Sequence, residues 1–120
     1  MYDALLTDLQ EHGADVEGAL KRFVGSKDMY GKFLYMIRDD ENYGQIAPAF
    51  EKGDGDAALT AVHTLKGVSG NLGLSRLYAA CSETVLLLRA GKFGEARASC
   101  GEIDAAYNEV CSILDAHSAP

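Results

Sequence analysis

The chain has 120 residues, of which 48% are apolar, and carries a net charge of −7 from 11 Lys and Arg against 18 Asp and Glu. This is the size of a single domain, with enough apolar residues for one core that needs no disulfide or metal. An acidic surface repels nucleic-acid phosphates and anionic lipid, which argues against both as partners. No apolar run approaches the roughly 20 residues of a membrane span, and no secretory signal opens the sequence.

The three cysteines, Cys81, Cys100 and Cys111, are odd in number and form no C-x-x-C pair. This pattern argues against a disulfide framework and against a zinc site. We expect small buried side chains in a reduced, cytoplasmic protein.

The sequence predicts helices throughout, because Ala and Leu are abundant and no set of segments alternates as strands do. The charged stretch 39–41, or Pro48, is expected to break the third helix, and Gly91 to end the fifth. Four longer helices joined by short loops predict an all-α, antiparallel up-down four-helix bundle with one or two short leading helices. In chain order, the expected helices are 2–12, 16–24 (capped by Asp15), 28–52, a helix capped by Asp54 or Asp56 and running to about Asn71, 75–90 and 93–117.

The helix that ends near Asn71 has two distinct faces. At about 100° per residue, its apolar side chains form one core stripe. His63 points roughly 170° away from the centre of that stripe, into solvent. The stripe comprises Ala58, Ala61, Val62, Leu65, Val68, Ser69 and Leu72; with His63 on the outer face lie Leu59, Thr60, Lys66, Gly67 and Gly70.

These outer residues are compatible with a histidine that accepts a phosphoryl group. A neutral imidazole is a nucleophile near pH 7, and Lys66, three residues on, supplies positive charge for the phosphoryl oxygens. Two glycines within a helix cost about 1 kcal/mol each relative to Ala, which suggests a surface that another molecule approaches closely. Gly67 and Gly70 could instead serve tight helix packing, although they lie opposite the apolar stripe. An exposed histidine is more often a simple solvated side chain. No metal site is expected, since no H-x-x-x-H or E-x-x-H pattern includes His63.

The segment from His63 to Gly73 reads H-T-L-K-G-V-S-G-N-L-G. It resembles the signature H-x-L-K-G-x-x-x-x-L-G of histidine-containing phosphotransfer (HPt) domains, with every fixed position present. The resemblance covers most of the chain, which is predicted to be one HPt domain, 1–120. Residues 1–14 form a leading helix outside the resemblance, and 15–118 form the core.

The resemblance implies an intermediate in a His–Asp phosphorelay rather than an enzyme. His63 would accept the phosphoryl group from a receiver-domain aspartyl phosphate and pass it to another receiver's aspartate. Lys66 would stabilise the group, Gly67 would give the receiver access, and Arg89 would add charge nearby. The implied partners are response-regulator receiver domains and a hybrid histidine kinase; no cofactor is expected, because Mg²⁺ would belong to the receiver.

One position departs from the family pattern. Many relatives have Glu or Gln facing the histidine four residues before the Arg89 position, where this chain has Val85. Ser82 or water could replace that polar group. Replacing Val85 with Gln is therefore predicted to alter the transfer rate or the phosphohistidine lifetime.

The candidate partner surface comprises Leu59, Thr60 and Gly70, and Leu59 is predicted to be an exposed apolar contact. An apolar rim around the histidine is expected to be extended by Phe33, Met36 and Tyr43.

Two alternatives remain: a helical adaptor that binds receivers without carrying phosphate, and the phosphotransfer domain of a chemotaxis-type histidine kinase. The intact His63 and Lys66 argue against the adaptor, and the short distance from Gly73 to Arg89 fits the relay type better. A monomer is the expected oligomeric state.

Overall fold

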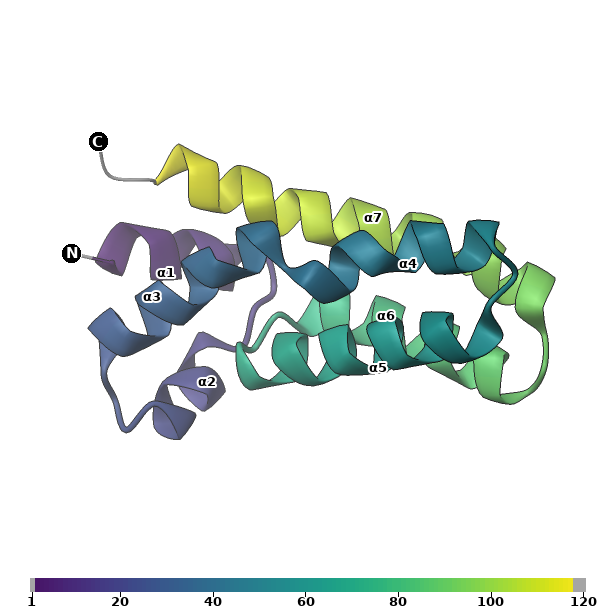
Figure 1. Cartoon of the computed structure of the whole chain (residues 1–120). Coiled ribbons are helices and arrows are strands. Elements are labelled where there is room, and N and C mark those ends of the chain that lie inside the picture. The colour runs from purple at the N-terminus through teal and green to yellow at the C-terminus, as the bar shows by residue number, and fades with distance from the viewer. Residues whose placement is uncertain (1, 118–120) are drawn as a thin grey trace.

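The computed structural model describes residues 2–117, and within that range all regular structure is helical (Figure 1). The predicted all-α class is confirmed, and the chain forms a helical bundle. Residue 1 and residues 118–120, which the predicted domain limits include, lie outside the described residues. The helices are α1 (Asp3–Glu11), α2 (Val16–Arg22), α3 (Lys27–Met36), α4 (Glu41–Glu51), α5 (Gly55–Asn71), α6 (Ser75–Arg89) and α7 (Phe93–Ala116).

Helices α4 to α7 pack together in chain order. Each packs against the next one in the chain, and α4 reaches α7 through stacked aromatic side chains. The rings of Tyr43 and Tyr107 are 3.7 Å apart between centroids, and those of Phe50 and Phe93 are 5.1 Å apart. These contacts close a core of side chains from every helix, so α5 has one buried face and one free face.

The predicted element 28–52 is divided in two. A 3₁₀ turn, Ile37–Asp39, ends α3, and the Asp40 side chain then accepts a hydrogen bond from the backbone N–H of Tyr43 at the start of α4. The break therefore falls at the acidic stretch, and three short helices precede α4 rather than the one or two expected.

Pro48 does not break the chain, contrary to one of the two expected positions, and lies inside α4. Proline removes one hydrogen bond to the carbonyl four residues earlier, here that of Gly44. Both residues are on the exposed side of α4, where water can satisfy that carbonyl. The opposite side of α4 buries Ile46, Ala49 and Phe50, which holds the helix in place.

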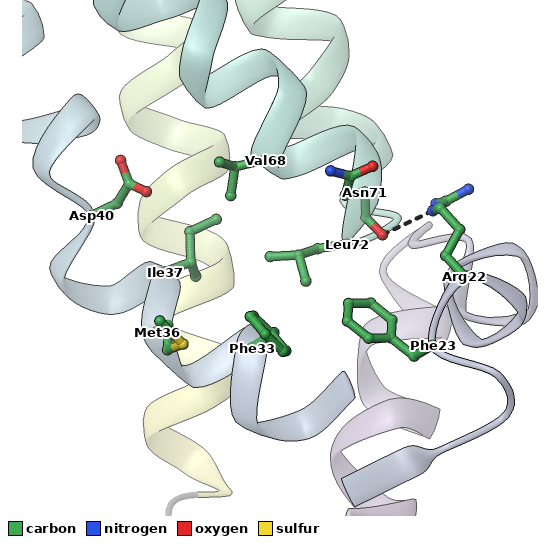
Figure 2. A pocket seen from close by; sticks show the side chains of 9 residues that line it. All are labelled: Arg22, Phe23, Phe33, Met36, Ile37, Asp40, Val68, Asn71 and Leu72. Atoms are coloured by element: carbon green, nitrogen blue, oxygen red, sulfur yellow. Dashed lines mark hydrogen bonds between the residues drawn. The ribbon is translucent and has the colours of Figure 1, made fainter. Parts of the chain in front are cut away.

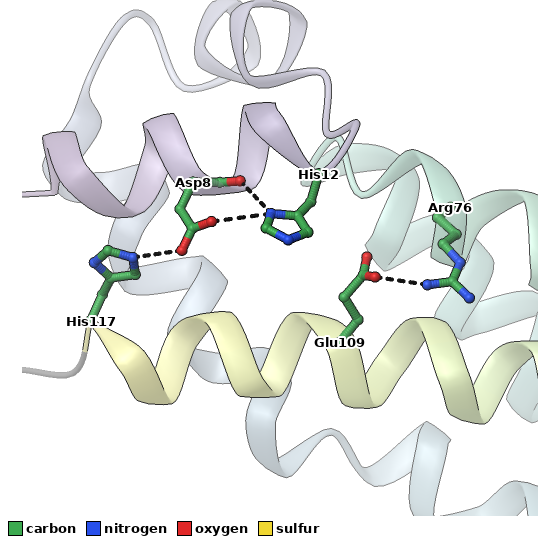
Figure 3. A network of polar contacts seen from close by, with 5 residues as sticks. All are labelled: Asp8, His12, Arg76, Glu109 and His117. Carbon is green, nitrogen blue, oxygen red and sulfur yellow. Dashed lines mark hydrogen bonds and ion pairs between the residues drawn. The ribbon is translucent and has the colours of Figure 1, made fainter.

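Helix α1 is attached to the far end of α7 by apolar and polar contacts. Leu5, Leu6 and Leu9 are buried. The Asp8 carboxylate lies 2.9 Å from Nε2 of His117 and 3.1 Å from Nδ1 of His12 (Figure 3). The hydrogen bond from His12 to the Asp8 carbonyl oxygen, and then the Asp8 carboxylate, raise the pKa of His12. The network anchors the first helix away from the free face of α5.

The cysteines are all free thiols, as expected. Cys81 is buried, and burial raises the pKa of its thiol to about 12; Cys100 and Cys111 are only half-buried. Within residues 2–117, no helix combines the length and the hydropathy needed to cross a membrane.

Candidate functional site

Helix α5 displays His63 on its free face. The Asp54 side chain accepts a hydrogen bond from the Ala57 N–H and so caps the helix start, one of the two predicted caps. The predicted stripe is buried apart from Val68, which is half-buried. His63 is exposed, as the helical periodicity predicts.

The free face of α5 has two sides that meet at His63. Lys66 and Gly70 lie toward α6, because both contact Tyr78 of that helix. Val68 and Asn71 lie toward α3, where they line a groove. By helical geometry, Gly67 and Thr60 fall on the α3 side of His63, and Leu59 falls on the α6 side.

Lys66 is half-buried, and its ammonium lies 5.6 Å from the centroid of the Tyr78 ring. This is cation–π distance. Among residues 2–117, no carboxylate lies within ion-pair distance of the Lys66 ammonium, so its charge is not neutralised by an acidic neighbour. The sequence predicted a role for Lys66 but did not single out Tyr78, which Lys66 contacts.

The two glycines on this face have different surroundings. A Cβ at Gly67 would meet nothing within 4 Å, so the backbone beside His63 is open to an incoming molecule. A Cβ at Gly70 would come within 3.0 Å of the Tyr78 ring. Gly70 therefore makes room for a side chain of the protein itself, which agrees with the alternative of tight helix packing at this position.

On α6, the structure corrects the expected role of Val85. Val85 is only 1% exposed and belongs to the core, so it does not face His63 from the surface. The Ser82 hydroxyl donates a hydrogen bond to the Tyr78 carbonyl oxygen at 2.8 Å. Arg89 is the last residue of α6 and is exposed; it has no hydrogen-bond or ion-pair partner among the described residues.

Two other predicted surface residues are placed differently by the structure. Leu59 is half-buried and packs against the core rather than standing exposed. Tyr43 stacks on Tyr107 and donates a hydrogen bond to the Asp104 carboxylate at 2.8 Å, so it faces α7 and not the rim around His63. A helical spacing shows which residues share a face, but not which neighbouring helix that face meets.

Phe33 and Met36 of α3 remain exposed, at 45% and 66%. They form one wall of a groove of about 530 Å³, and Val68 and Leu72 form the other (Figure 2). Phe23, at the end of α2, closes one end, and its ring is tilted against that of Phe33 at 5.5 Å between centroids. The groove adjoins the α3 side of the free face and is mainly apolar.

The leading helices also hold the end of α5. The last carbonyls of a helix have no partners within it. The Arg22 guanidinium donates hydrogen bonds to the carbonyl oxygens of Gly70 and Asn71, and the buried Tyr30 hydroxyl donates to that of Leu72 at 2.6 Å. Thus α2 and α3 fix the helix end that carries the second half of the motif.

Gly73, the last residue of the motif, is required by its own geometry. Its φ is +69°, in the left-handed region that favours glycine, and a Cβ there would collide with the backbone of Asp15. The Asp15 N–H in turn donates to the Gly73 carbonyl oxygen at 2.8 Å. The final glycine of the motif thus joins α5 to the leading helices.

A helical bundle that displays one histidine, flanked by a lysine and an open glycine, defines a class of histidine phosphotransfer domains. The model of the Hpt domain family matches residues 1–113, and the chain belongs to this family. The match starts at residue 1 and so includes α1. Membership assigns the chain to histidine phosphotransfer in two-component signalling, as a carrier domain that interacts with receiver and kinase proteins. Comparison with the curated proteins and with the solved structures gave no match.

No group of three or more His, Cys, Asp or Glu side chains within residues 2–117 is arranged to hold a metal ion. The three histidines are also separated: His12 and His117 flank Asp8 at the α1 end, apart from His63.

Proposed function

We propose that this protein is a phosphorelay intermediate whose phosphoryl acceptor is His63. It takes the group from the aspartyl phosphate of one receiver domain and passes it to the aspartate of a second. The observation that supports this most is the exposure of His63 on α5, with Lys66 on one side and open backbone at Gly67 on the other. In this proposal α4 to α7 are an up-and-down four-helix bundle, and the protein acts as a cytoplasmic monomer.

The transfer step needs no cofactor from this chain. The imidazole nitrogen that carries the lone pair forms a bond to phosphorus while the aspartyl oxygen–phosphorus bond breaks, and the aspartate leaves as a carboxylate. The proton on the other ring nitrogen stays in place. The reverse sequence, with a second receiver's carboxylate as nucleophile, discharges the histidine. Mg²⁺ is expected in the receiver's acidic pocket.

The residues around His63 have two roles in this proposal: some supply positive charge, and one gives the receiver access to the backbone. Phosphoryl transfer depends mainly on alignment and on positive charge at the phosphoryl oxygens. Lys66 supplies that charge, since its ammonium forms no ion pair with an acidic side chain of the described residues. Gly67 lets the receiver's loops approach the backbone, and the unpaired Arg89, at the end of α6, adds charge at the edge of the site.

The receiver is proposed to dock over the α3 side of the free face. Exposed Phe33 and Met36 and the groove behind them provide apolar surface next to the motif. Thr60 lies at the edge of this contact on the α3 side, and the exposed part of Leu59 lies beyond it, on the α6 side of His63. Relay contacts of this kind are small and transient, so a few apolar residues carry much of the affinity.

The deciding experiment follows the intact mass of the protein after mixing with phosphorylated receiver domains and Mg²⁺. We expect a gain of one phosphoryl group that is labile in acid and stable in alkali. His63→Gln abolishes it, whereas His12→Gln, at the histidine beside Asp8, leaves it unchanged. Phosphoramidate, a small phosphodonor, serves as a second probe. A folded protein that binds receivers but accepts no phosphoryl group from either source would instead be the adaptor.

A further inference from the structure

The contact between Lys66 and Tyr78 is one that the motif does not explain. The Lys66 ammonium lies 5.6 Å from the centroid of the Tyr78 ring, and the ring is 42% exposed at the α5–α6 boundary. The glycine at position 70 lets the ring lie close to α5, since a Cβ there would approach the ring to 3.0 Å and push it away by a few tenths of an ångström. Gly70 and Tyr78 thus form one local arrangement, whose effect is to place a π-face under the lysine.

The direction of this contact is informative. The ring lies beside Gly70, which is four residues beyond Lys66, whereas His63 is three residues before it. At about 1.5 Å rise per residue, the ring and the imidazole are on opposite sides of Lys66 along α5. An ammonium over Tyr78 is therefore drawn toward the end of α5, away from His63.

We infer that Tyr78 is a positioning residue that holds Lys66 away from His63 until a phosphoryl group arrives, and so lowers the stability of the phosphohistidine. This inference rests on the proposed function. In this inference the ring and the phosphoryl oxygens compete for the one ammonium of Lys66. A ligand shifts an equilibrium only by its differential interaction with the two states. The ring stabilises the unphosphorylated state. This favours transfer of the phosphoryl group from His63 to the next receiver.

The contact itself is measured by NMR on the unphosphorylated protein. The Lys66 ε-methylene protons should show an upfield ring-current shift in the wild type and in Tyr78→Phe, which keeps the ring. The shift should disappear in Tyr78→Leu, and phosphorylation of His63 by phosphoramidate should reduce it in the wild type. A shift that persists unchanged after phosphorylation would overturn the inference, because Lys66 would not have left the ring.

The consequence is measured as the phosphorylated fraction at a fixed ratio of phosphoramidate to ammonia. In this reaction the imidazole nitrogen bonds to phosphorus as the phosphorus–nitrogen bond of the donor breaks and ammonia leaves. We expect Tyr78→Leu to raise the equilibrium constant for phosphorylation by roughly two- to five-fold, the range for an exposed cation–π contact. Tyr78→Phe should match the wild type.

Two further variants separate positioning from a merely structural role. Gly70→Ala should shift the ring by a few tenths of an ångström and change the equilibrium in the same direction as Tyr78→Leu but by less, whereas Gly101→Ala, in a helix where the Cβ meets nothing within 4 Å, should not change it. In a Lys66→Met background, Tyr78→Leu should have no effect on the equilibrium. If it has the same effect with and without Lys66, the inference is wrong.

The two proposals fail separately. A wild type that phosphoramidate labels, with an equilibrium that Tyr78→Leu leaves unchanged, would leave the phosphorelay function standing and remove the role of Tyr78. A folded wild type that neither phosphoramidate nor any receiver labels would remove the proposed function, and the inference with it.

Discussion

The two sides of α5 next to His63 differ in kind. On the α6 side the surface is filled: Tyr78 packs on Gly70, and the Lys66 ammonium lies over its ring. On the α3 side the surface is open, with a groove of about 530 Å³ between α3 and the end of α5. The first side holds the lysine charge over an aromatic ring, and the second presents apolar side chains with space behind them.

This difference separates two tasks that would otherwise interfere. Charge next to the histidine acts on the phosphoryl group, where electrostatic contacts change during the reaction. Apolar contacts bind the partner equally before and after transfer, because they do not sense the phosphoryl charge. A carrier that meets two receivers gains from docking that is independent of its phosphorylation state. Variants on the two sides should accordingly affect different measurements.

The largest expected effect is on stability. It tests whether position 85 of α6 belongs to the core or to the surface beside His63. Val85 is 1% exposed, whereas its neighbour Leu86 is 67% exposed. Val85→Gln buries an amide without a prepared partner and adds volume, so it should lower the free energy of unfolding by about 2–4 kcal/mol. Leu86→Gln should change it by less than about 0.5 kcal/mol. Urea unfolding measures both.

The sequence alone predicted that Val85→Gln changes the transfer rate or the phosphohistidine lifetime; the structure adds an expected loss of stability. If Val85→Gln were as stable as the wild type and changed the phosphohistidine lifetime, the glutamine would have to reach the site, as the polar residue of many relatives is expected to do.

The next effect is on chemistry. Lys66→Met removes the charge and keeps most of the side-chain volume, so it should slow labelling of His63 by about 10- to 100-fold, the loss of one charged contact of about 1.5–3 kcal/mol. Receiver affinity should change little. Lys52→Met, at an exposed lysine just after α4, is the matched control and should label at the wild-type rate. Equal slowing in both variants would assign the effect to overall charge.

The third effect is on docking. Met36→Glu and Phe33→Glu place a carboxylate at the mouth of the groove and should each weaken receiver binding by roughly ten-fold, a typical loss for an apolar anchor. Labelling by phosphoramidate should be unaffected, because both side chains are on α3. A titration with the receiver that labels His63 gives the affinity. Slower labelling by phosphoramidate in these variants would mean that the two sides of α5 are not independent.

The sequence predicted what a single helix determines. The α5 stripe, the exposure of His63, the cap at Asp54 and the left-handed Gly91 all follow from spacing or from local backbone chemistry, and the structure confirms them. The motif then identified the family. Each of these features depends on residues within a few positions of one another.

What the sequence missed depends on how helices meet. Tyr43 was expected on the rim around His63, but it faces α7, where Tyr107 and Asp104 are available. Val85 was expected to face the histidine, but the rotation of α6 turns it into the core. Tyr78 was not singled out at all, although a glycine within a helix at position 70 was a signal that some neighbour packs closely there.

The smallest expected effect concerns Leu59, which lies on the α6 side yet belongs to the predicted partner surface. Because Leu59 is half-buried against the core, only part of it can touch a receiver. Leu59→Glu should therefore weaken receiver binding by only about two- to three-fold, less than Met36→Glu, since contacts at an interface edge contribute little. The same titration compares the two variants, and urea unfolding confirms that Leu59→Glu is folded. A larger loss from Leu59→Glu than from Met36→Glu would move the docking surface to the α6 side, where it would share residues with the charge that acts on the phosphoryl group.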